Sequence, residues 1–253
     1  MKFLRFQTKD GSINTGWLDE NKVGRVEGDI FGEYRRMEAI FDLQTVKVIE
    51  PVVPTKIICM GRNFHEHARE LGNEIADVPM LFMKPVSAMI ANGQEIILPP
   101  QSRQVEHEAE LVVVIGKKGR WIQADKASKY IFGFTIGNDV TARDLQARDG
   151  QWTRAKGFDT FCPVGPWIET ELDPADVLIT CKVNSELRQM ASSKEMVFTI
   201  SQIVAFASSI MTLEPGDLIF TGTPAGVGPL TDGDKCEITI EGIGTLFNFV
   251  SEK

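Results

Sequence analysis

Apolar residues along this chain occur mainly in short runs and in alternation with polar residues, a pattern that predicts β-strands more often than helices. Over the first 50 residues the short apolar runs are separated by turn residues, among them Gly11, Asn21 and Gly28. We therefore expect a small β meander at the N-terminus. Its predicted strands are residues 1–7, 14–18 and 22–27.

A linker is predicted after this meander. Pro51 and Pro54 lie close together before the next apolar run, and prolines at this spacing mark a turn or loop. With 253 residues the chain is long enough for one large domain with a small appendage. We therefore predict a small N-terminal β domain at residues 1–53 and a larger domain at residues 54–253.

The larger domain is predicted to be mostly β structure with a few helices, so the fold class is mainly β with some α. Capping boxes mark the start of two of the helices, formed by Thr141 with Asp144 and by Thr199 with Gln202. The second of these helices has an apolar stripe that faces the core, formed by Ile200, Ile203, Val204, Phe206 and Ile210. Strands are predicted at residues 56–60, 81–84, 111–115, 131–139, 177–183, 186–189 and 218–220, and helices at residues 62–72, 124–130, 141–150 and 199–210.

Glutamates precede the most apolar of these strands. Residues 111–115 are all branched and apolar, which predicts a buried strand, and the alternation before it places Glu106, Glu108 and Glu110 on one face. Carboxylates on one face repel each other unless a cation neutralises them, and a set of oxygen ligands suits Mg²⁺, Mn²⁺ or Ca²⁺. An edge strand whose carboxylates point at water is the alternative that this motif leaves open.

A histidine and a glutamate form the second informative pair. They lie on a short predicted helix, with Asn63 and Glu66 as its capping box and Gly72 at its end. His67 and Glu70 are three residues apart, so they share a face and the carboxylate can raise the basicity of the imidazole, as a general base needs. A solvated pair on a surface helix is the alternative. All histidines of the chain fall in these two stretches, namely His65, His67 and His107.

Other polar side chains stand at the ends of predicted elements. Lys84 ends a strand, and its spacing is also compatible with a surface lysine whose charged end reaches water. Asp139 ends another strand, where a simple turn residue is the alternative. Arg143 and Gln146 are three residues apart on the helix that follows and share a face.

Two segments are predicted as loops. Residues 150–160 are dense in polar and aromatic groups and include Lys156. Residues 221–228 are rich in glycine, but they lack the G-K-[ST] ending of a phosphate-binding loop and precede a predicted strand instead of a helix. We expect this second loop to bind a carboxylate or to form a turn.

The composition is that of an ordinary globular protein, with 43% hydrophobic and 25% charged residues. The net charge of −8 argues against a broad surface for nucleic acid or for an anionic membrane. The cysteines are scattered without a C-x-x-C pair, so we expect reduced, mostly buried thiols. The first residues lack the apolar region of a signal peptide, and no stretch approaches transmembrane length. We therefore expect a cytoplasmic protein.

Taken together, these segments resemble the fumarylacetoacetate hydrolase family from about Lys56 to Phe249. The resemblance is carried by several runs in the same order along the chain. They are Gly61-Arg-Asn-Phe-His-Glu-His67-Ala-Arg-Glu70, Leu81-Phe-Met-Lys84-Pro85, His107-Glu108-Ala-Glu110-Leu111, Asn138-Asp139-Val-Thr-Ala-Arg143-Asp-Leu-Gln146, Ala155-Lys156-Gly-Phe-Asp159, Val183-Asn-Ser-Glu-Leu-Arg-Gln189 and Thr221-Gly-Thr-Pro-Ala-Gly-Val-Gly228.

The resemblance implies a mixed β-roll with a few helices, usually as a homodimer, and the small N-terminal β domain fits the shorter bacterial members. It implies that Glu108, Glu110 and Asp139 hold Mg²⁺ or Mn²⁺, with Ca²⁺ as a further candidate. His67 and Glu70 match the family's dyad, which lies on a mobile lid helix.

The resemblance also assigns the substrate contacts. Lys156 matches the lysine that reaches the reacting carbonyl, and Lys84 is expected as a further contact in the site. The groups that match those holding the carboxylate end of a 2-oxo acid are Arg143, Gln146 and Thr223.

The chain departs from the family pattern in three places. Phe64 stands where tyrosine is usual, so any hydroxyl contact there is lost, and Gly157 replaces a common serine. Glu106 adds a carboxylate near the predicted ligands. None of these changes removes a predicted ligand or a member of the dyad.

Hydrolysis of the C–C bond of an acylpyruvate is the reaction expected first, with His67 activating water and pyruvate enolate leaving. The same residues would serve an oxaloacetate-type decarboxylase, or an isomerase or tautomerase of a 2-hydroxy-diene-dioate such as 5-carboxymethyl-2-hydroxymuconate. A metal-binding or interaction module without activity is the last alternative, and the intact carboxylates, dyad and lysine argue against it.

Overall fold

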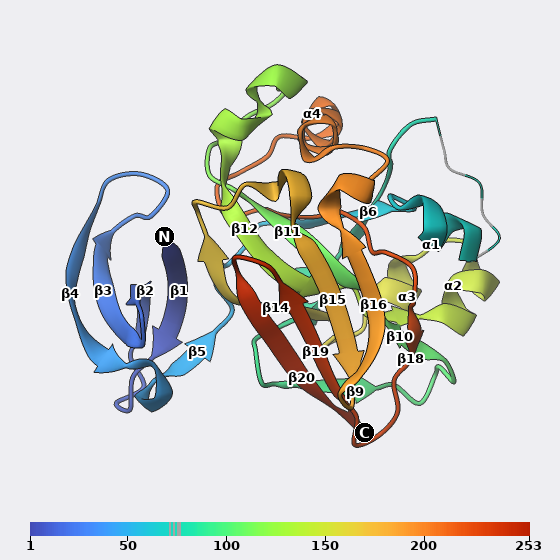
Figure 1. Cartoon of the computed structure of the whole chain (residues 1–253), viewed down its shortest axis with the longest axis horizontal. Coiled ribbons are helices and arrows are strands. Elements are labelled where there is room, and N and C mark those ends of the chain that lie inside the picture. The colour runs from blue at the N-terminus through green and yellow to red at the C-terminus, as the bar shows by residue number, and fades with distance from the viewer. Residues whose placement is uncertain (71, 73, 75–76) are drawn as a thin grey trace.

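The structure is a computed structural model that describes residues 1–70, 72, 74 and 77–253. A small lobe of N-terminal strands stands beside a larger body that contains the other sheets and the helices (Figure 1). The chain is mainly β with a few short helices, which confirms the predicted fold class.

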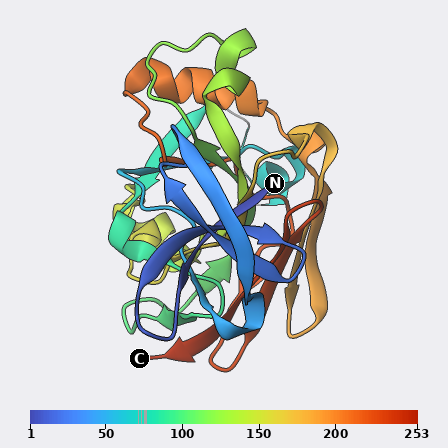
Figure 2. The same cartoon turned by 90° about the vertical axis from the view of Figure 1, so that its left-hand side faces the viewer.

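The N-terminal lobe is an antiparallel meander, in which β1 pairs with β2, β2 with β3 and β3 with β4 (Figure 2). Its small core contains Leu4, Phe6 and Val23. The sequence pattern does not predict β4, because charged residues interrupt its apolar ones and most of the strand is exposed. The elements are β1 (Lys2–Gln7), β2 (Ile13–Asp19), β3 (Lys22–Gly28), β4 (Tyr34–Asp42), a 3-10 helix (Leu43–Thr45) and β5 (Lys47–Ile49).

Strand β1 joins the lobe to the body. Lys2 and Phe3 pair antiparallel with Glu169 and Ile168 of β14 (Cys162–Glu169). The backbone hydrogen bonding therefore runs from the lobe into the largest sheet of the body without a break. The division near residue 53 stays a prediction.

The centre of the body is β11 (Ala109–Ile115), which is buried over its whole length. The strand is covered on both faces: Leu111 and Val113 pack into the main core, whereas Val112 and Val114 pack into a second cluster. Burial on both faces explains why its sequence is continuously apolar instead of alternating. The sheet has the order β4-β3-β2-β1-β14-β12-β11-β17-β6-β7, and its other strands are β6 (Ile57–Gly61), β7 (Met80–Lys84), β8 (Met89–Ile90), β12 (Ile131–Asn138) and β17 (Leu218–Phe220).

A second sheet of order β16-β15-β19-β20-β9 covers the main core from the other side. Its Ile179, Ile238 and Leu246 belong to the same core cluster as Leu111 and Val113. The sheets wrap around this core as a mixed β-roll (Figure 1). The strands are β9 (Glu95–Leu98), β15 (Leu178–Val183), β16 (Glu186–Ser192), β19 (Lys235–Ile240) and β20 (Gly244–Glu252), and a small third sheet contains β10 (Val105–His107), β13 (Thr141–Ala142) and β18 (Gly228–Pro229).

Short helices complete the body. Figure 1 shows α1, α2 and α3 together on the side away from the N-terminal lobe, and α4 above the sheets. Helix α3 lies in the segment 150–160 that is predicted as a loop, so Lys156 stands on a helical turn. The helices are α1 (His65–Glu70), α2 (Arg143–Asp149), α3 (Thr153–Lys156) and α4 (Ile200–Ile210), and the remaining 3-10 helices are Val86–Ala88, Ala124–Tyr130, Pro174–Asp176 and Ser193–Glu195.

One predicted capping box is confirmed. At the start of α4, the Thr199 side chain accepts a hydrogen bond from the Gln202 N–H, and the Gln202 side chain accepts one from the Thr199 N–H. Ile203 and Val204 of the predicted stripe are buried, whereas Ile210 is exposed at the end of the helix.

The other two predicted capping boxes are wrong, because the capping side chains bind elsewhere. The Asn63 amide bonds to backbone groups of residues 198 and 221, which ties the start of α1 to distant segments. The Thr141 hydroxyl donates to the carbonyl of Asp139, and α2 begins without a side-chain cap. Both helices are nevertheless present, since packing rather than capping defines their ends.

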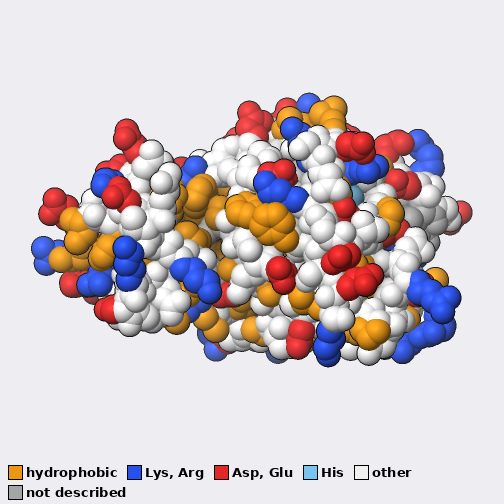
Figure 3. Space-filling view, turned by 90° about the horizontal axis from the view of Figure 1, so that it is seen from below, with side chains coloured by type: hydrophobic (Ala, Val, Ile, Leu, Met, Phe, Trp, Pro, Cys, Tyr) orange, Lys and Arg blue, Asp and Glu red, His pale blue; other side chains and the backbone are white. Residues whose placement is uncertain are grey.

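All cysteines are free and buried, as the sequence predicts. Within the described ranges, no helix combines the length and apolar character needed to cross a membrane. On the face shown in Figure 3, acidic and basic side chains are mixed, and hydrophobic side chains lie where the lobe meets the body.

A buried aspartate fastens the linker to the central sheet. Asp217, which is fully buried, accepts hydrogen bonds from the N–H groups of Thr55, Lys56 and Glu214 and from the Thr55 hydroxyl. The Lys56 ammonium forms an ion pair with the same carboxylate. Because Lys56 precedes β6 and Asp217 precedes β17, this cluster holds the start of both parallel strands.

We expect Asp217→Ala to lower the free energy of unfolding by about 3 kcal/mol, because it leaves a partly buried ammonium and several N–H groups unpaired. Urea denaturation measures the change. Asp42→Ala is the control: Asp42 also pairs with a lysine, Lys22, but that pair is exposed and should contribute less than about 1 kcal/mol. Equal effects of the two substitutions would contradict the assigned role of Asp217.

Candidate active site

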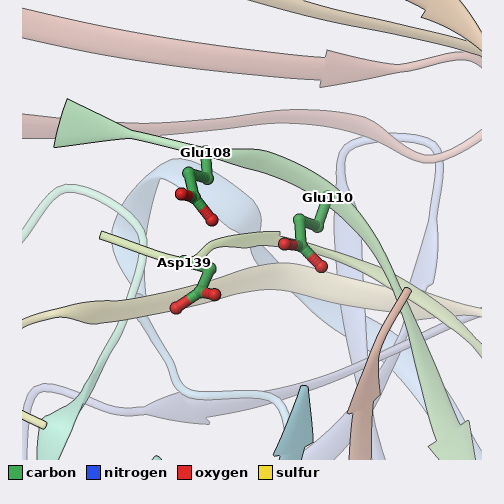
Figure 4. Close-up of side chains that lie close together, drawn as sticks. All are labelled: Glu108, Glu110 and Asp139. Carbon is green, nitrogen blue, oxygen red and sulfur yellow. The ribbon is translucent and has the colours of Figure 1, made fainter. Parts of the chain in front are cut away.

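Carboxylates from neighbouring strands meet at one end of the central sheet. Glu108 lies between β10 and β11, Glu110 lies on β11, and Asp139 follows β12. The antiparallel register pairs Ala109 with Asn138, which places the segments side by side. Oxygen atoms of the three carboxylates lie within 4.8 Å of one another (Figure 4). The side chains that the sequence proposes as ligands are therefore brought together, and all three are buried.

Backbone contacts fix this arrangement. The Asp139 N–H donates to the Glu108 carbonyl at 2.9 Å, and the Glu108 N–H donates to the Asn138 side chain at 2.9 Å. The Gly222 N–H donates to the Glu110 carboxylate at 2.6 Å. A Cβ on Gly222 would lie 2.7 Å from the Cβ of Asn63, so this approach requires glycine.

Cations surround two of the carboxylates. Lys156 Nζ lies 2.8 Å from Glu108 and 2.6 Å from Asp139. Lys84 Nζ lies 2.6 Å from the other oxygen of Asp139. Arg143 bridges Glu108 at 2.7 Å and Glu106 at 2.8 Å.

These contacts decide between the alternatives left open by the sequence. Lys84 is buried, so it is not a surface lysine whose end reaches water. Asp139 is an ion-paired, buried group and not a simple turn residue. The glutamates do not point at water from an edge strand, because Glu106, Glu108 and Glu110 are all buried.

Glu110 differs from its neighbours in having no cationic partner among the described residues. Burial, together with the negative charges of Asp139 and Glu108, raises the pKa of Glu110 well above its usual range. Burial would also raise the pKa of Glu108, but the charges of Lys156 and Arg143 outweigh it and hold that pKa well below its usual range. The cluster thus contains one carboxylate whose negative charge is not neutralised by a cationic side chain of the described residues.

The donor set fits a hard divalent cation. Three carboxylates supply only oxygen atoms, which Mg²⁺, Mn²⁺ and Ca²⁺ prefer. A cation placed among them would neutralise Glu110, the carboxylate of this cluster that has no cationic partner within the described part of the chain. Glu108, Glu110 and Asp139 are therefore candidate ligands.

The predicted dyad is formed on α1. His67 Nδ1 lies 3.3 Å from the Glu70 carboxylate, and His67 is buried. Glu70 also accepts hydrogen bonds from the Gly226 N–H at 3.1 and 3.2 Å. The pair differs from a solvated surface contact in that the imidazole is buried, whereas the exposed Glu70 links α1 to the glycine-rich loop.

One cavity of about 290 Å³ brings the imidazole of the dyad together with two of the three carboxylates, whereas Glu70 and Asp139 do not line it. His67 lines it together with Glu108, Glu110 and Lys156, whereas His65 on the same helix does not. Arg143 and Gln146 also line it. Arg143 donates a hydrogen bond to the side-chain amide oxygen of Gln146 at 2.8 Å, which leaves the side-chain NH₂ group of Gln146 unused by that bond.

Thr223 lines the cavity, and hydrogen bonds to Ala109 and Gln189 fix the position of its hydroxyl. Its hydroxyl donates to the Ala109 carbonyl at 2.9 Å and lies 2.8 Å from the Gln189 amide nitrogen. Gln189 in turn accepts from the Ala109 N–H and contacts His107 at 3.0 Å. Burial lowers the pKa of His107, and this histidine lies behind the carboxylates, outside the cavity lining.

Several residues of the cavity are absent from the set proposed from sequence. They contribute apolar surface and one further cation: Met60, Gly61, Arg62, Phe82, Ala147 and Trp152. Arg62 and Gly61 lie inside a motif that the sequence singles out, which is the signal that could have drawn attention to them. Trp152 lies in the aromatic segment before Lys156, where residue spacing alone does not indicate which way its side chain points.

Comparison with known proteins gives consistent matches. The family model described as fumarylacetoacetate (FAA) hydrolase C-terminal matches residues 56–251, and a model described as Rv2993c-like, N-terminal matches residues 1–51. The mitochondrial oxaloacetate tautomerase FAHD2B of Bos taurus is 42% identical over 218 residues, which cover 81% of this chain and 69% of that protein.

Solved structures agree with these matches. The 2-hydroxyhepta-2,4-diene-1,7-dioate isomerase of Mycobacterium marinum is 42% identical with a TM-score of 0.92, and covers 100% of this chain and 99% of its own. The maleylpyruvate hydrolase of Sphingobium sp. SYK-6, solved with manganese(II) and pyruvate, is 31% identical with a TM-score of 0.82 at 100% and 99% coverage.

We expect Glu110→Gln to weaken Mn²⁺ binding by more than the roughly 10–100-fold lost when a group that only orients a ligand is removed. The reason is that it removes one of the three converging carboxylates. Isothermal titration calorimetry measures the affinity. Glu106→Gln serves as the control, since Glu106 is also buried but pairs with Arg143 outside the cluster. Unchanged Mn²⁺ affinity in Glu110→Gln would rule out Glu110 as a ligand.

Proposed function

Because this chain belongs to the fumarylacetoacetate hydrolase family, we propose that it is an enzyme that moves a proton on a 2-oxo acid through an enolate. The observation that carries the proposal is one cavity lined by a buried imidazole, which has a carboxylate partner, and by two members of a cluster of three carboxylates. A proton acceptor and a site for an electron-withdrawing cation are the two components that enolisation of a 2-oxo acid requires.

The proposed cofactor is Mg²⁺ or Mn²⁺, held by Glu108, Glu110 and Asp139. When bound, such a cation acts as a Lewis acid that polarises the 2-oxo group. Arg143 and Gln146 line the cavity next to this cluster, and their N–H groups suit the carboxylate of the substrate.

His67 is the proposed general base. Its Nδ1 is engaged by Glu70, so Nε2 is the ring nitrogen left to accept a proton from C3 of the substrate. The Glu70 carboxylate stabilises the imidazolium that forms and fixes the orientation of the ring. The electron pair of the broken C3–H bond moves towards the 2-oxo oxygen, and the buried Lys156 ammonium supplies positive charge in that region.

We place enol–keto tautomerisation first among the reactions. It needs only the proton transfer described above, and the relative named as an oxaloacetate tautomerase is 42% identical. The carbon atom to which the proton returns then decides the product. Isomerisation of a 2-hydroxy-diene-dioate therefore uses the same residues. The 42% identical structure named as such an isomerase supports this extension.

Hydrolysis of an acylpyruvate is the second candidate. Here His67 takes its proton from water, the oxygen attacks the acyl carbonyl, and the C–C bond breaks with its electron pair moving into the pyruvate enolate. The 31% identical structure named as a maleylpyruvate hydrolase favours this reaction. Decarboxylation of oxaloacetate would use the same electron flow with CO₂ as the leaving group.

The reactions are separated by their products. We expect the protein with Mn²⁺ or Mg²⁺ to speed the enol–keto conversion of oxaloacetate, followed by ultraviolet absorbance, and EDTA to abolish the effect. Assays for pyruvate, acetate and CO₂ on oxaloacetate and acetylpyruvate run in parallel. Pyruvate with acetate would move the assignment to hydrolysis, and pyruvate with CO₂ would move it to decarboxylation. Silence on both substrates would move the test to the 2-hydroxy-diene-dioates, and silence there as well would leave a binding module.

His67→Ala should lower kcat by about 10²–10⁴-fold, because it removes the group that transfers the proton. Mn²⁺ affinity should remain within about threefold of the unaltered protein, since His67 is not among the three carboxylates. His65→Ala is the matched control, because His65 is exposed on the same helix and does not line the cavity. Full turnover in His67→Ala would refute the role of the dyad.

A further inference from the structure

We infer that Arg62 binds a second, distal carboxylate of the substrate, and that the enzyme therefore prefers 2-oxo dicarboxylic acids to 2-oxo monocarboxylic acids. This inference rests on the proposed function, and it assigns the substrate class of that site.

Arg62 is the cationic side chain of the cavity that has no partner among the residues that the structure describes. Three lysine or arginine side chains line the cavity, namely Arg62, Arg143 and Lys156. Arg143 is engaged by Glu106 and Glu108, and Lys156 by Glu108 and Asp139. Arg62 forms neither an ion pair nor a side-chain hydrogen bond with any residue in the described ranges.

The position of Arg62 is defined by its neighbours. Gly61 lies against the side chains of Met80 and Trp152, where an added Cβ would be 2.7 and 3.1 Å from their nearest atoms. Asn63 is buried and bonded to backbone groups of residues 198 and 221. Arg62 itself has a backbone φ of 57°. Residues other than glycine rarely adopt this backbone conformation unless the surrounding structure imposes it. The guanidinium is therefore presented from a fixed backbone.

The charges of the site explain why a second cation is needed. The site as a whole contains the carboxylates of Glu106, Glu108, Glu110 and Asp139 and the cations of Lys84, Lys156 and Arg143, which leaves one negative charge uncompensated. A divalent cation converts this into one positive charge, which a single substrate carboxylate neutralises. A second carboxylate would add an unpaired negative charge in a partly buried cavity, where it requires its own partner.

Arg62 suits that partner role. It is only partly exposed, so its interactions are less screened than those on the open surface. A guanidinium also presents parallel N–H groups that match a carboxylate in bidentate geometry.

A pair of unreactive four-carbon ligands tests the inference by binding. Malate carries two carboxylates, whereas 2-hydroxybutanoate has the same chain length but only one. In the Mn²⁺-loaded protein, calorimetry should show malate binding at least about tenfold tighter, the lower range for a charge-assisted hydrogen bond. Arg62→Gln should remove most of this preference by weakening malate, with 2-hydroxybutanoate unchanged within about threefold.

Two further variants control the result. Arg62→Lys keeps the charge and should retain part of the preference. Arg69→Gln removes an arginine from α1 that is exposed, pairs with Glu66 and does not line the cavity, so it should change neither affinity. An unmodified protein without a preference for malate overturns the inference, as does an Arg62→Gln variant that weakens both ligands equally or neither.

The binding test is independent of the reaction. If the malate preference depends on Arg62 but no 2-oxo acid is turned over, the proposed catalysis fails while the assignment of Arg62 stands. If oxaloacetate and acetylpyruvate are both turned over and Arg62→Gln lowers kcat/KM equally for the two, the catalysis stands and the assignment of Arg62 fails.

Discussion

The structure of the site depends on how cationic side chains neutralise the negative charges of its buried carboxylates. Each carboxylate near Glu108 lies away from water and would be unstable alone. Lys84, Lys156 and Arg143 are placed on separate elements so that each meets a different oxygen. The positions of β7, α2 and α3 around the central sheet are therefore constrained by the same charges that define the chemistry.

The fold supplies this compensation through buried strands. Strand β11 is covered on both faces, so its end can carry Glu110 into the protein interior without exposing backbone. The neighbouring β12 delivers Asp139 in register, and the glycine-rich loop after β17 closes the site with the N–H of Gly222. The strand ends that border the hydrophobic core thus also carry the side chains of the site.

Much of this arrangement could be predicted from sequence, and the exceptions have physical causes. Alternation along the strand correctly grouped Glu108 with Glu110, since strand geometry is local. The meeting with Asp139, and the burial of Lys84, depend on pairing between distant strands, which only the family resemblance indicated. The capping box predicted at Asn63 failed because tertiary contacts claimed its side chain. Arg62 lies inside a run that the family resemblance singled out, but that run assigned it no role, since its importance lies in the partners that it lacks within the described chain.

The Glu70 carboxylate contacts two partners, the His67 imidazole and the N–H of Gly226. Glu70 and Gly226 are 156 residues apart in the chain. Any movement of the loop away from α1 would break the contact between Gly226 and Glu70, and the carboxylate that orients the imidazole would lose its anchor. The orientation of the proposed base is thereby coupled to a loop that is remote in the sequence, so the geometry of proton transfer depends on how that loop packs against α1.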